Sequence, residues 1–578
     1  MFNNYELAIT EHEIDDILEN KSVEYKFDPF DAYENLHVND KKALIHLIKA
    51  AMALNDVFLM QDHSKNLEIR SIIAKAELDG DKLASKLFKL FNIFNGIEGN
   101  DGLSKEPVRL FKDLKLASGK NVFPEDVKKE EIIEYLKNNI EDAPSLLSND
   151  TVVRKENNNF VAYPYSIAFK NEYKEAAKEL LLAAKNTTHK DFAKYLRYQA
   201  QALTSNDPEF AYKADKTWAG LTDSPLEFTI GRESYEDTLT GAIAEDKELN
   251  AILEENCITI KSKDFIGARV GIVDIKASQD LADYKNHLKA LSKLMPLQEK
   301  YKQSVDQGDK EEIKQVLVDV DLVYLSGDYA ALRPGITLAQ NLPNDDKLAV
   351  QLNSGNRNVF HKQVRRTFDP ERRQKMLDNL VEKELHIYYD NEADHLFTIG
   401  HELTHSLGPM STLEGKDKKV SLGDGYGDVL EECKADVGSL VGIEYFVKIG
   451  KYSEELSKKV IVTWAVDQMP ISEPKITQAH RVREVMQLNY FIENGAIVLT
   501  KGSKLNVNID LMIPTAKKLL EEVIQIQLVG DPERAKAFVD KYRNWNDVLE
   551  YVSEVKKSLK PKPYKILTIT LAEKLLSQ

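Results

Sequence analysis

Two histidines and a glutamate in the segment HELTH, which begins at His401, have the types and spacing of a metal site. On a helix, residues i and i+4 lie on one face, so His401 and His405 can direct their imidazoles at one ion. The preceding apolar residues indicate a helix that enters the core, and Gly408 predicts its end. Glu402 stands beside the pair, where it can take a proton from zinc-bound water. The motif alone leaves open a chance match on a helix with surface histidines.

A catalytic zinc ion needs a third protein ligand, and the helix expected at residues 429–446 can supply a carboxylate. This segment has two adjacent candidates, Glu431 and Glu432. Glu432 has Asp436 one turn on along the same face, whereas Glu431 has Ala435 there. An acid in that position can accept a hydrogen bond from an imidazole ligand. We therefore favour Glu432 as the ligand and Asp436 as the orienting acid, with Glu431 also beside the site.

Two alternatives bear on this third ligand. A further histidine downstream, as metzincins use, is excluded because Ser411 stands at the required position. The other alternative is a charged helix face exposed to solvent. Against it, Val437, Leu440 and Val441 follow directly and indicate a largely buried helix. Buried carboxylates need partners, which a metal ion and its histidines would provide.

These residues resemble the dipeptidyl peptidase III family of zinc exopeptidases. The block EECKAD, which begins at Glu431, is similar to the family's EECRAE or EECRAD. The second glutamate of that block binds zinc in the family, which maps onto Glu432. The HELTH motif is one residue shorter than the typical family motif and resembles a branch found in some bacteria and in a plant protein fused to a Nudix domain. The resemblance implies one Zn²⁺ ion per chain.

Three further segments resemble motifs of this family and follow its order along the chain. IGRESYED is similar to a segment in which a glutamate binds the substrate ammonium and a tyrosine assists the transition state, which implies these roles for Glu233 and Tyr235. NLPN is similar to an Asn-x-Pro-Asn segment that binds the substrate amine and backbone, which implicates Asn341 and Asn344. QAHRVREVM resembles a helix whose histidine stabilises the transition state, which maps onto His480. Taken alone, IGRESYED also fits an exposed polar face of a strand, and NLPN also fits a turn. The histidine of QAHRVREVM, taken alone, also fits a structural role.

The motifs together predict a zinc metallo-exopeptidase that releases dipeptides from the free N-termini of oligopeptides. In this interpretation Glu402 is the general base, while His480 and Tyr235 stabilise the oxyanion. Two alternatives stay open. One is a zinc aminopeptidase, endopeptidase or other metallohydrolase on the same fold, and the other is a catalytically inactive binding protein that keeps the zinc fold. The intact Glu402 disfavours the inactive protein, because a structural zinc site has no use for a base.

The composition excludes several other classes of protein. The 578 residues are 42% hydrophobic and 30% charged, with a formal net charge of −16. An acidic chain lacks the electrostatic footprint of a partner for nucleic acid or anionic membrane, so we expect neither. Two cysteines exclude a disulfide scaffold. We find no apolar run near bilayer length and no signal peptide, which predicts a cytoplasmic protein unless a leader was trimmed before Met1. The oligomeric state is not indicated.

The periodicity predicts an α+β fold in which helical and strand-rich stretches alternate. Helices are expected at 41–60, 189–203, 279–304 and across most of 372–550, strands at 228–236, 268–275 and within 322–360, and a surface loop at 148–159. The family resemblance implies two lobes around a wide cleft, one mostly helical and carrying zinc, the other with a β-barrel-like core plus helices. We expect residues 1–282, 322–362 and 557–578 to build the strand-containing lobe, and residues 283–321 and 363–556 the helical one.

Overall fold

The computed structural model describes residues 5–101, 106–157, 159–233, 237–296, 316–330, 339–342, 357–365, 367, 369–409, 411–423 and 425–577. They form two compact units, each assembled from segments that are distant in the sequence. The first unit is Met1–Ile275, Val320–Ile336 and Lys562–Gln578, and the second is Lys276–Asp319 and Thr337–Pro561. The predicted α+β architecture with two lobes is confirmed.

The boundaries of the units differ from the expected division of the chain by a few residues at most places and most widely at 337–362, which groups with the helical unit. The strand β9 (Ala339–Leu342) lies within the stretch 322–362, which we expected to belong entirely to the strand-containing lobe. In the structure β9 groups with the helical unit, because it contacts the helix α20 (Asn391–His405).

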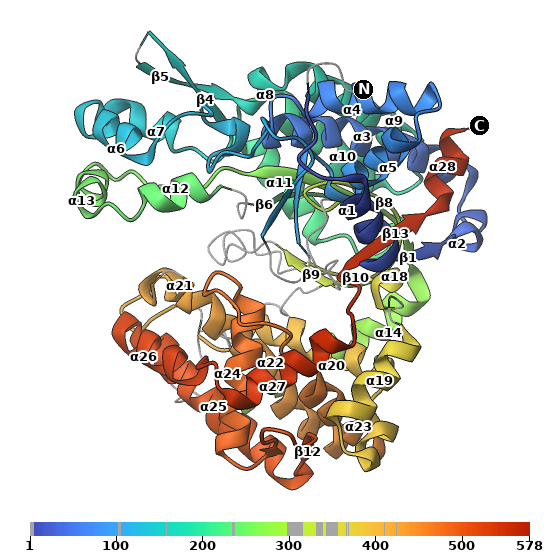
Figure 1. Ribbon diagram of the computed structural model, residues 1–578, viewed down its shortest axis with the longest axis vertical. Helices are drawn as coiled ribbons and strands as arrows, with labels where there is room; N and C mark the ends of the chain where they lie inside the picture. The colour runs from blue at the N-terminus through green and yellow to red at the C-terminus, as the bar shows by residue number, and fades with distance from the viewer. Residues whose placement is uncertain are drawn as a thin grey trace. The chain divides into compact units, whose positions relative to one another are not determined.

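Helices packed on one another make up most of the first unit (Figure 1). The longer ones are α3 (Val38–Asp62), α4 (Asn66–Leu78), α5 (Lys82–Phe94), α6 (Lys129–Asn138), α9 (Lys170–Asn186), α10 (Lys190–Thr204), α11 (Pro208–Ala219) and α13 (Lys247–Glu255). On α10, Phe192, Leu196, Gln199 and Leu203 are buried at intervals of three and four residues. That spacing gives the helix one face for the core.

The helix α3 corrects one expectation from the sequence. It is long and apolar enough to cross a membrane by length and composition, with a mean hydropathy of 1.6 in its most apolar window. However, 56% of that window is buried inside the protein, and α3 packs against α9 and the strand β7 (Phe265–Asp274). A buried core helix of a globular unit has the same composition as a membrane span. Its packing therefore accounts for its apolar character.

A five-stranded sheet runs in the order β6-β7-β8-β10-β9. Its other strands are β6 (Leu226–Glu233), β8 (Val316–Gly327) and β10 (Arg357–His361). The strand β7 is buried along nearly its whole length, as expected for a strand covered on both faces. It pairs antiparallel with β6, so that Gly231 lies opposite Gly267. A Cβ atom on Gly231 would overlap the ring of Tyr329, so the glycine allows this ring to lie against the ladder just before Glu233.

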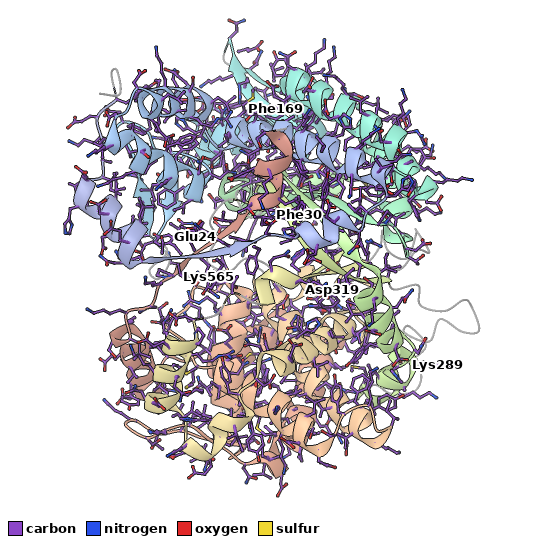
Figure 2. The ribbon with its side chains drawn as sticks, turned by 90° about the vertical axis from the view of Figure 1, so that its right-hand side faces the viewer. Glu24, Phe30, Phe169, Lys289, Asp319 and Lys565 are labelled. Carbon is purple, nitrogen blue, oxygen red and sulfur yellow. The ribbon has the colours of Figure 1, made fainter. Side chains whose placement is uncertain are left out.

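Three smaller pairs of strands lie in the described part of the first unit, and the shortest is β2 (Glu98–Asn100) with β3 (Pro107–Arg109). The parallel strands β1 (Ser22–Phe27) and β13 (Tyr564–Ile569) join the two ends of the chain, and Figure 2 labels Glu24 on one and Lys565 on the other. The strands β4 (Thr151–Glu156) and β5 (Asn159–Pro164) form an antiparallel pair. The loop predicted at 148–159 is therefore wrong. The β-branched residues that begin β4 are buried, and this burial outweighs the polar residues of the turn.

The second unit is a group of helices, most of which are shown from yellow to orange-red in Figure 1, with α14 in green. Its main helices are α14 (Ile275–Lys285), α15 (Leu288–Leu294), α19 (Pro370–Leu380), α20, α21 (Lys418–Ser421), α22 (Tyr426–Lys448), α23 (Glu454–Asp467), α24 (Ala479–Glu493), α25 (Ile509–Val529), α26 (Pro532–Tyr542) and α27 (Asp547–Ser558). The helix α22 is buried through most of its length and contacts α20, α24 and α25. It is the central element of this unit.

The helices α20 and α22 approach each other closely because two glycines lie at their contact. A Cβ atom on Gly400 of α20 would overlap the hydroxyl of Ser439 on α22. Conversely, a Cβ atom on Gly438 of α22 would overlap the methyl group of Thr404 on α20. Neither overlap can be relieved by rotating a long flexible side chain, so larger residues would push the two helices apart.

We predict that Gly438→Ala lowers the free energy of unfolding by about 1–3 kcal/mol, the usual cost of overpacking a core. Gly241→Ala is the matched control. Gly241 is an exposed helical glycine with nothing within 4 Å of its added Cβ, so this change should raise stability by about 0.5–1 kcal/mol. Urea denaturation measures both. Equal stability of the Gly438 variant and the unmodified protein would contradict the close-packing argument.

Candidate metal centre

The helix α20 carries both histidines of the HELTH segment, and local sequence sets its two ends. At its start, Asp390 accepts hydrogen bonds from two backbone N–H groups of the first turn. At its other end the helix stops at His405, and Gly408 adopts a φ of +87°, a conformation that favours glycine. The rings of His401 and His405 lie with centroids 4.7 Å apart. The spacing of four residues thus brings the two rings together on one face.

Three atoms from α20 and α22 converge on one point. The Nε2 atoms of His401 and His405 are 3.1 Å apart. The Oε2 atom of Glu432 lies 3.4 Å from the first nitrogen and 3.9 Å from the second. Tetrahedral ligands at zinc distances of about 2.0–2.1 Å are separated from one another by about 3.3 Å. The three residues therefore fit a divalent metal ion.

The Glu432 carboxylate gives an independent reason to place an ion here. Its Oε2 atom is buried and has no hydrogen-bond partner among the described residues. A buried carboxylate oxygen without a hydrogen bond is costly unless a cation lies beside it. A metal ion held jointly with the two histidines would satisfy this oxygen.

Each histidine is held from behind by a different buried acid. His401 donates from Nδ1 to Oδ1 of Asp436 at 2.6 Å, and His405 donates from Nδ1 to Oε1 of Glu431 at 3.1 Å. An ionised carboxylate only accepts hydrogen bonds, so the hydrogen must lie on Nδ1 in both rings. This arrangement fixes the ring orientation and directs Nε2 of each imidazole toward the ion.

The two acids keep their negative charge because cations and donors surround them. Burial alone would raise the pKa of Asp436, but Arg483 and the hydrogen bond from His401 hold that pKa below its usual value. Trp464 also donates to Asp436, from Nε1 at 3.3 Å. Asp436 can therefore accept a hydrogen bond from an imidazole at neutral pH.

The negative charge of Glu431 is stabilised in the same way, by neighbouring cations. Burial would raise the pKa of Glu431, but Lys418 and Lys434 hold it well below the usual range. Their Nζ atoms lie 3.1 Å and 2.8 Å from its carboxylate.

The protons of the site would compete with a metal ion. Burial disfavours the imidazolium form of His401, but the hydrogen bond to Asp436 and the nearby carboxylate of Glu432 outweigh burial and raise its pKa to about 10. Burial would also raise the pKa of Glu432, yet the neighbouring His480 and His401 lower it well below its usual value. A metal ion must displace a proton from Nε2 of His401, so its affinity should weaken as pH falls.

Glu402 and His480 lie at the edge of this cluster. Glu402 follows His401 on α20, is half-buried, and has no hydrogen-bond or ion-pair partner among the residues that the structure describes. His480 stands in the first turn of α24 with 68% of its side chain exposed, and its Nδ1 lies 3.2 Å from Oε2 of Glu432. The charge of Glu432 raises the pKa of His480. A carboxylate with no partner among the described residues and an exposed imidazole thus stand beside the three ligand atoms.

The other predicted site residues are placed only in part. Glu233 is the last residue of β6 and Asn341 lies in β9, and for both the structure describes the backbone alone. Asn341 pairs with Asn358 of β10, and its strand contacts α20. Tyr235 and Asn344 lie outside the described residues. The substrate roles of these four residues therefore stay predictions.

Sequence reasoning missed the cations and the tryptophan behind the two acids. Arg483 could have been suspected, because it lies one turn after His480 on α24. Lys434 could also have been suspected, since it lies three residues after Glu431 on α22. No local signal marks Lys418 or Trp464, which reach the site from other helices.

We predict that the purified chain holds one divalent metal ion and that Glu432→Ala loses it, because the change removes one of three converging ligand atoms. Elemental analysis of metal per chain is the measurement. Glu444→Ala is a matched control, since Glu444 is an exposed acid on the same helix, paired with Lys517. The control should keep its metal. Full retention by the Glu432 variant would place the third ligand elsewhere.

Comparisons with known proteins address the class of this protein. No family model matches the chain. Nudix hydrolase 3 of Arabidopsis thaliana is 25% identical over 555 residues, which cover 87% of this chain and 67% of that protein.

Two solved structures match nearly the whole chain. A dipeptidyl peptidase III from Caldithrix abyssi has a TM-score of 0.78 and 26% identity, covering 97% of this chain and 99% of that one. The enzyme from Corallococcus sp. strain EGB has a TM-score of 0.78 and 23% identity, covering 98% of both chains. The chain therefore has the fold of dipeptidyl peptidase III, and the family resemblance that its motifs predicted is confirmed.

Proposed function

We propose that this chain is a zinc metallo-exopeptidase that releases dipeptides from the free N-termini of oligopeptides. The observation that carries the proposal is the convergence of Nε2 of His401, Nε2 of His405 and Oε2 of Glu432, with the unpaired carboxylate of Glu402 alongside. A purely structural zinc site is closed by four protein ligands and needs no base. Three ligands beside a free carboxylate are typical of a hydrolytic site.

Peptide hydrolysis needs an activated water, a polarised carbonyl and a proton for the leaving amine. A bound zinc ion would supply the Lewis acidity for the first two. Glu402 would accept the proton from the attacking water and then deliver it to the leaving nitrogen. Its half-exposed position and the absence of a partner among the described residues leave its carboxylate available for this transfer.

His480 is suited to stabilise the charge that develops on the scissile carbonyl oxygen. The carboxylate of Glu432 raises its pKa, so the ring keeps a proton to donate more readily than an isolated histidine. A donor that is in place before the reaction can contribute about 2.7–4 kcal/mol to transition-state stabilisation. The family resemblance assigns a second donor to Tyr235.

Dipeptide release requires a group that binds the α-ammonium at a fixed distance from the metal. The resemblance assigns this role to Glu233, with Asn341 and Asn344 holding the peptide backbone. The contact between β9 and α20 supports the assignment for Asn341, since its strand lies against the helix that carries both histidines. Localisation in the cytoplasm is part of the same proposal and rests on the sequence alone.

We expect Glu402→Ala to keep its metal and its fold but to lower kcat at least about 100-fold, because general bases typically contribute 10²–10⁴-fold. Steady-state kinetics on a peptide substrate, together with metal analysis of the same sample, measures this. Glu392→Ala, an exposed acid in the first turn of the same helix, should behave like the unmodified enzyme. If the Glu402 variant kept more than about a hundredth of the original kcat, Glu402 would not be the base.

We expect the enzyme to cleave free peptides and to discriminate against the same peptides with acetylated N-termini. A hydrogen bond to a charged group is typically worth about 1.5–3 kcal/mol, so kcat/KM should differ by at least roughly tenfold. Mass spectrometry of the products on a matched pair of peptides gives both the rate and the register. Replacing Glu233 with glutamine should reduce the difference in kcat/KM between the free and the acetylated peptide.

The possible outcomes separate the peptidase classes. Dipeptides as the first product, from free N-termini only, would support the proposal. Single amino acids as the first product would identify an aminopeptidase. Equal cleavage of free and acetylated peptides would identify an endopeptidase. Either of the last two results would contradict dipeptide release while leaving the metal site intact.

A further inference from the structure

The carboxylate of Glu431 is surrounded by four donors from four helices. Its Oε1 atom accepts a hydrogen bond from Nδ1 of His405 at 3.1 Å and forms an ion pair with Nζ of Lys434 at 2.8 Å. Its Oε2 atom accepts a hydrogen bond from Nε2 of Gln527 at 3.1 Å and forms an ion pair with Nζ of Lys418 at 3.1 Å. A carboxylate has about four acceptor sites, so every one of them is used. Glu431 therefore cannot rotate without breaking several hydrogen bonds.

The same two lysines also bind the segment that directly follows the helix carrying the histidines. Lys434 donates to the backbone oxygen of Leu407 at 2.7 Å, and Lys418 donates to that of Pro409 at 2.9 Å. Lys434 also lies 3.4 Å from the backbone oxygen of His405. Carbonyl groups at the end of a helix have no partners within the helix and carry partial negative charge. Lys434 therefore reaches the last carbonyl of α20, and both lysines fix the segment that leaves this helix as well as the acid that holds His405.

Gly408 allows this close contact between the chain and Lys434. Its φ of +87° is unfavourable for other residues, and a Cβ atom there would lie 3.2 Å from Cδ of Lys434. The lysine side chains are almost fully buried, with exposed fractions of 0% for Lys434 and 4% for Lys418. Two buried cations facing one carboxylate are costly unless other acceptors share their charge, and the carbonyls of Leu407 and Pro409, just after α20, provide these acceptors.

From this geometry we infer that Lys418 and Lys434 are positioning residues for the metal ligand His405. They act through Glu431 on one side of the ring and through the end of α20 on the other. Neither lysine has an atom among the ligands, so each affects the ion only by fixing where Nε2 of His405 points. Removal of groups that orient metal ligands typically weakens metal affinity about 10–100-fold. The inference rests on the proposed metal site.

The experiment measures zinc affinity of the full chain by competition with a chromophoric chelator. Lys434→Met and Lys418→Met remove one cation each while keeping the length of the side chain, and each should weaken zinc binding about 10–100-fold. Lys434→Arg keeps a cation at the same position and should recover most of the affinity. If Lys434→Met does not fold, Lys418→Met provides the same test from a different helix.

A third buried lysine, in the first unit, supplies the matched control. Lys263 is also fully buried, and its Nζ binds the backbone oxygens of Leu146 and Ser148 in the first unit. Lys263→Met should lower the free energy of unfolding of the metal-free protein as the other two variants do, but leave zinc affinity unchanged. This comparison separates a loss of stability from a loss of ligand positioning.

The outcomes distinguish this inference from the proposed function. If the unmodified chain binds no zinc, both the metal site and the positioning role are wrong. If the unmodified chain binds zinc and both methionine variants bind it within twofold of the same affinity, the site stands and the positioning role is overturned. Weaker binding in the Lys418 and Lys434 variants, with the Lys263 variant unchanged, supports the inference.

Discussion

The metal centre depends on how closely α20 and α22 approach each other. Two of the converging ligand atoms come from one helix and the third from the other, so their separation is set by the contact of the helices. Gly400 and Gly438 make that contact possible, because a Cβ atom at either position would overlap the facing helix. The edges of the ligand triangle, from 3.1 Å to 3.9 Å, leave little room for displacement. Shifts of even 1 Å at such sites are large compared with the tolerance of metal ligation.

Around that contact the protein buries an unusual number of charges. Glu431, Glu432 and Asp436 lie within six residues of α22, and Lys418, Lys434 and Arg483 face two of them. Such groups add little net stability, since the cost of taking them out of water offsets their attraction. Removing any one of them leaves its partners buried and unpaired, which costs far more. The arrangement is better explained by the orientation of the two imidazoles than by stability of the fold.

The sequence predicted the parts of this site that follow from local spacing. His401 and His405 lie one helical turn apart, and the acid one turn beyond Glu432 binds the ring of His401 in the structure. The predicted α+β fold is also confirmed, because long periodic segments such as α10 and α22 bury one face or the whole helix. Lys418 and Trp464 were missed since their contacts join helices that are distant in the sequence.

Two other features show where local patterns mislead. The stretch 148–159 has the composition of a loop, yet its buried β-branched residues pair as the strand β4. The helix α3 has the composition of a membrane span, yet it packs within the first unit. In both, tertiary burial decides the structure, and burial of a segment against distant elements cannot be read from its own residues.

The adjacent glutamates Glu431 and Glu432 show why the ligand could not be settled by residue type. Both are buried carboxylates one position apart on α22, and the chemistry available to them is the same. They differ in what surrounds them: the oxygens of Glu431 accept two hydrogen bonds and form two ion pairs with lysines, whereas Oε2 of Glu432 has no hydrogen-bond partner among the described residues. A saturated carboxylate cannot also bind a metal ion, because its lone pairs are already used. Lys418 on α21, Lys434 on α22 and Gln527 on α25 occupy the oxygens of Glu431 and so leave Glu432 as the acid available to the ion. The choice of ligand is therefore made by residues that are not themselves ligands.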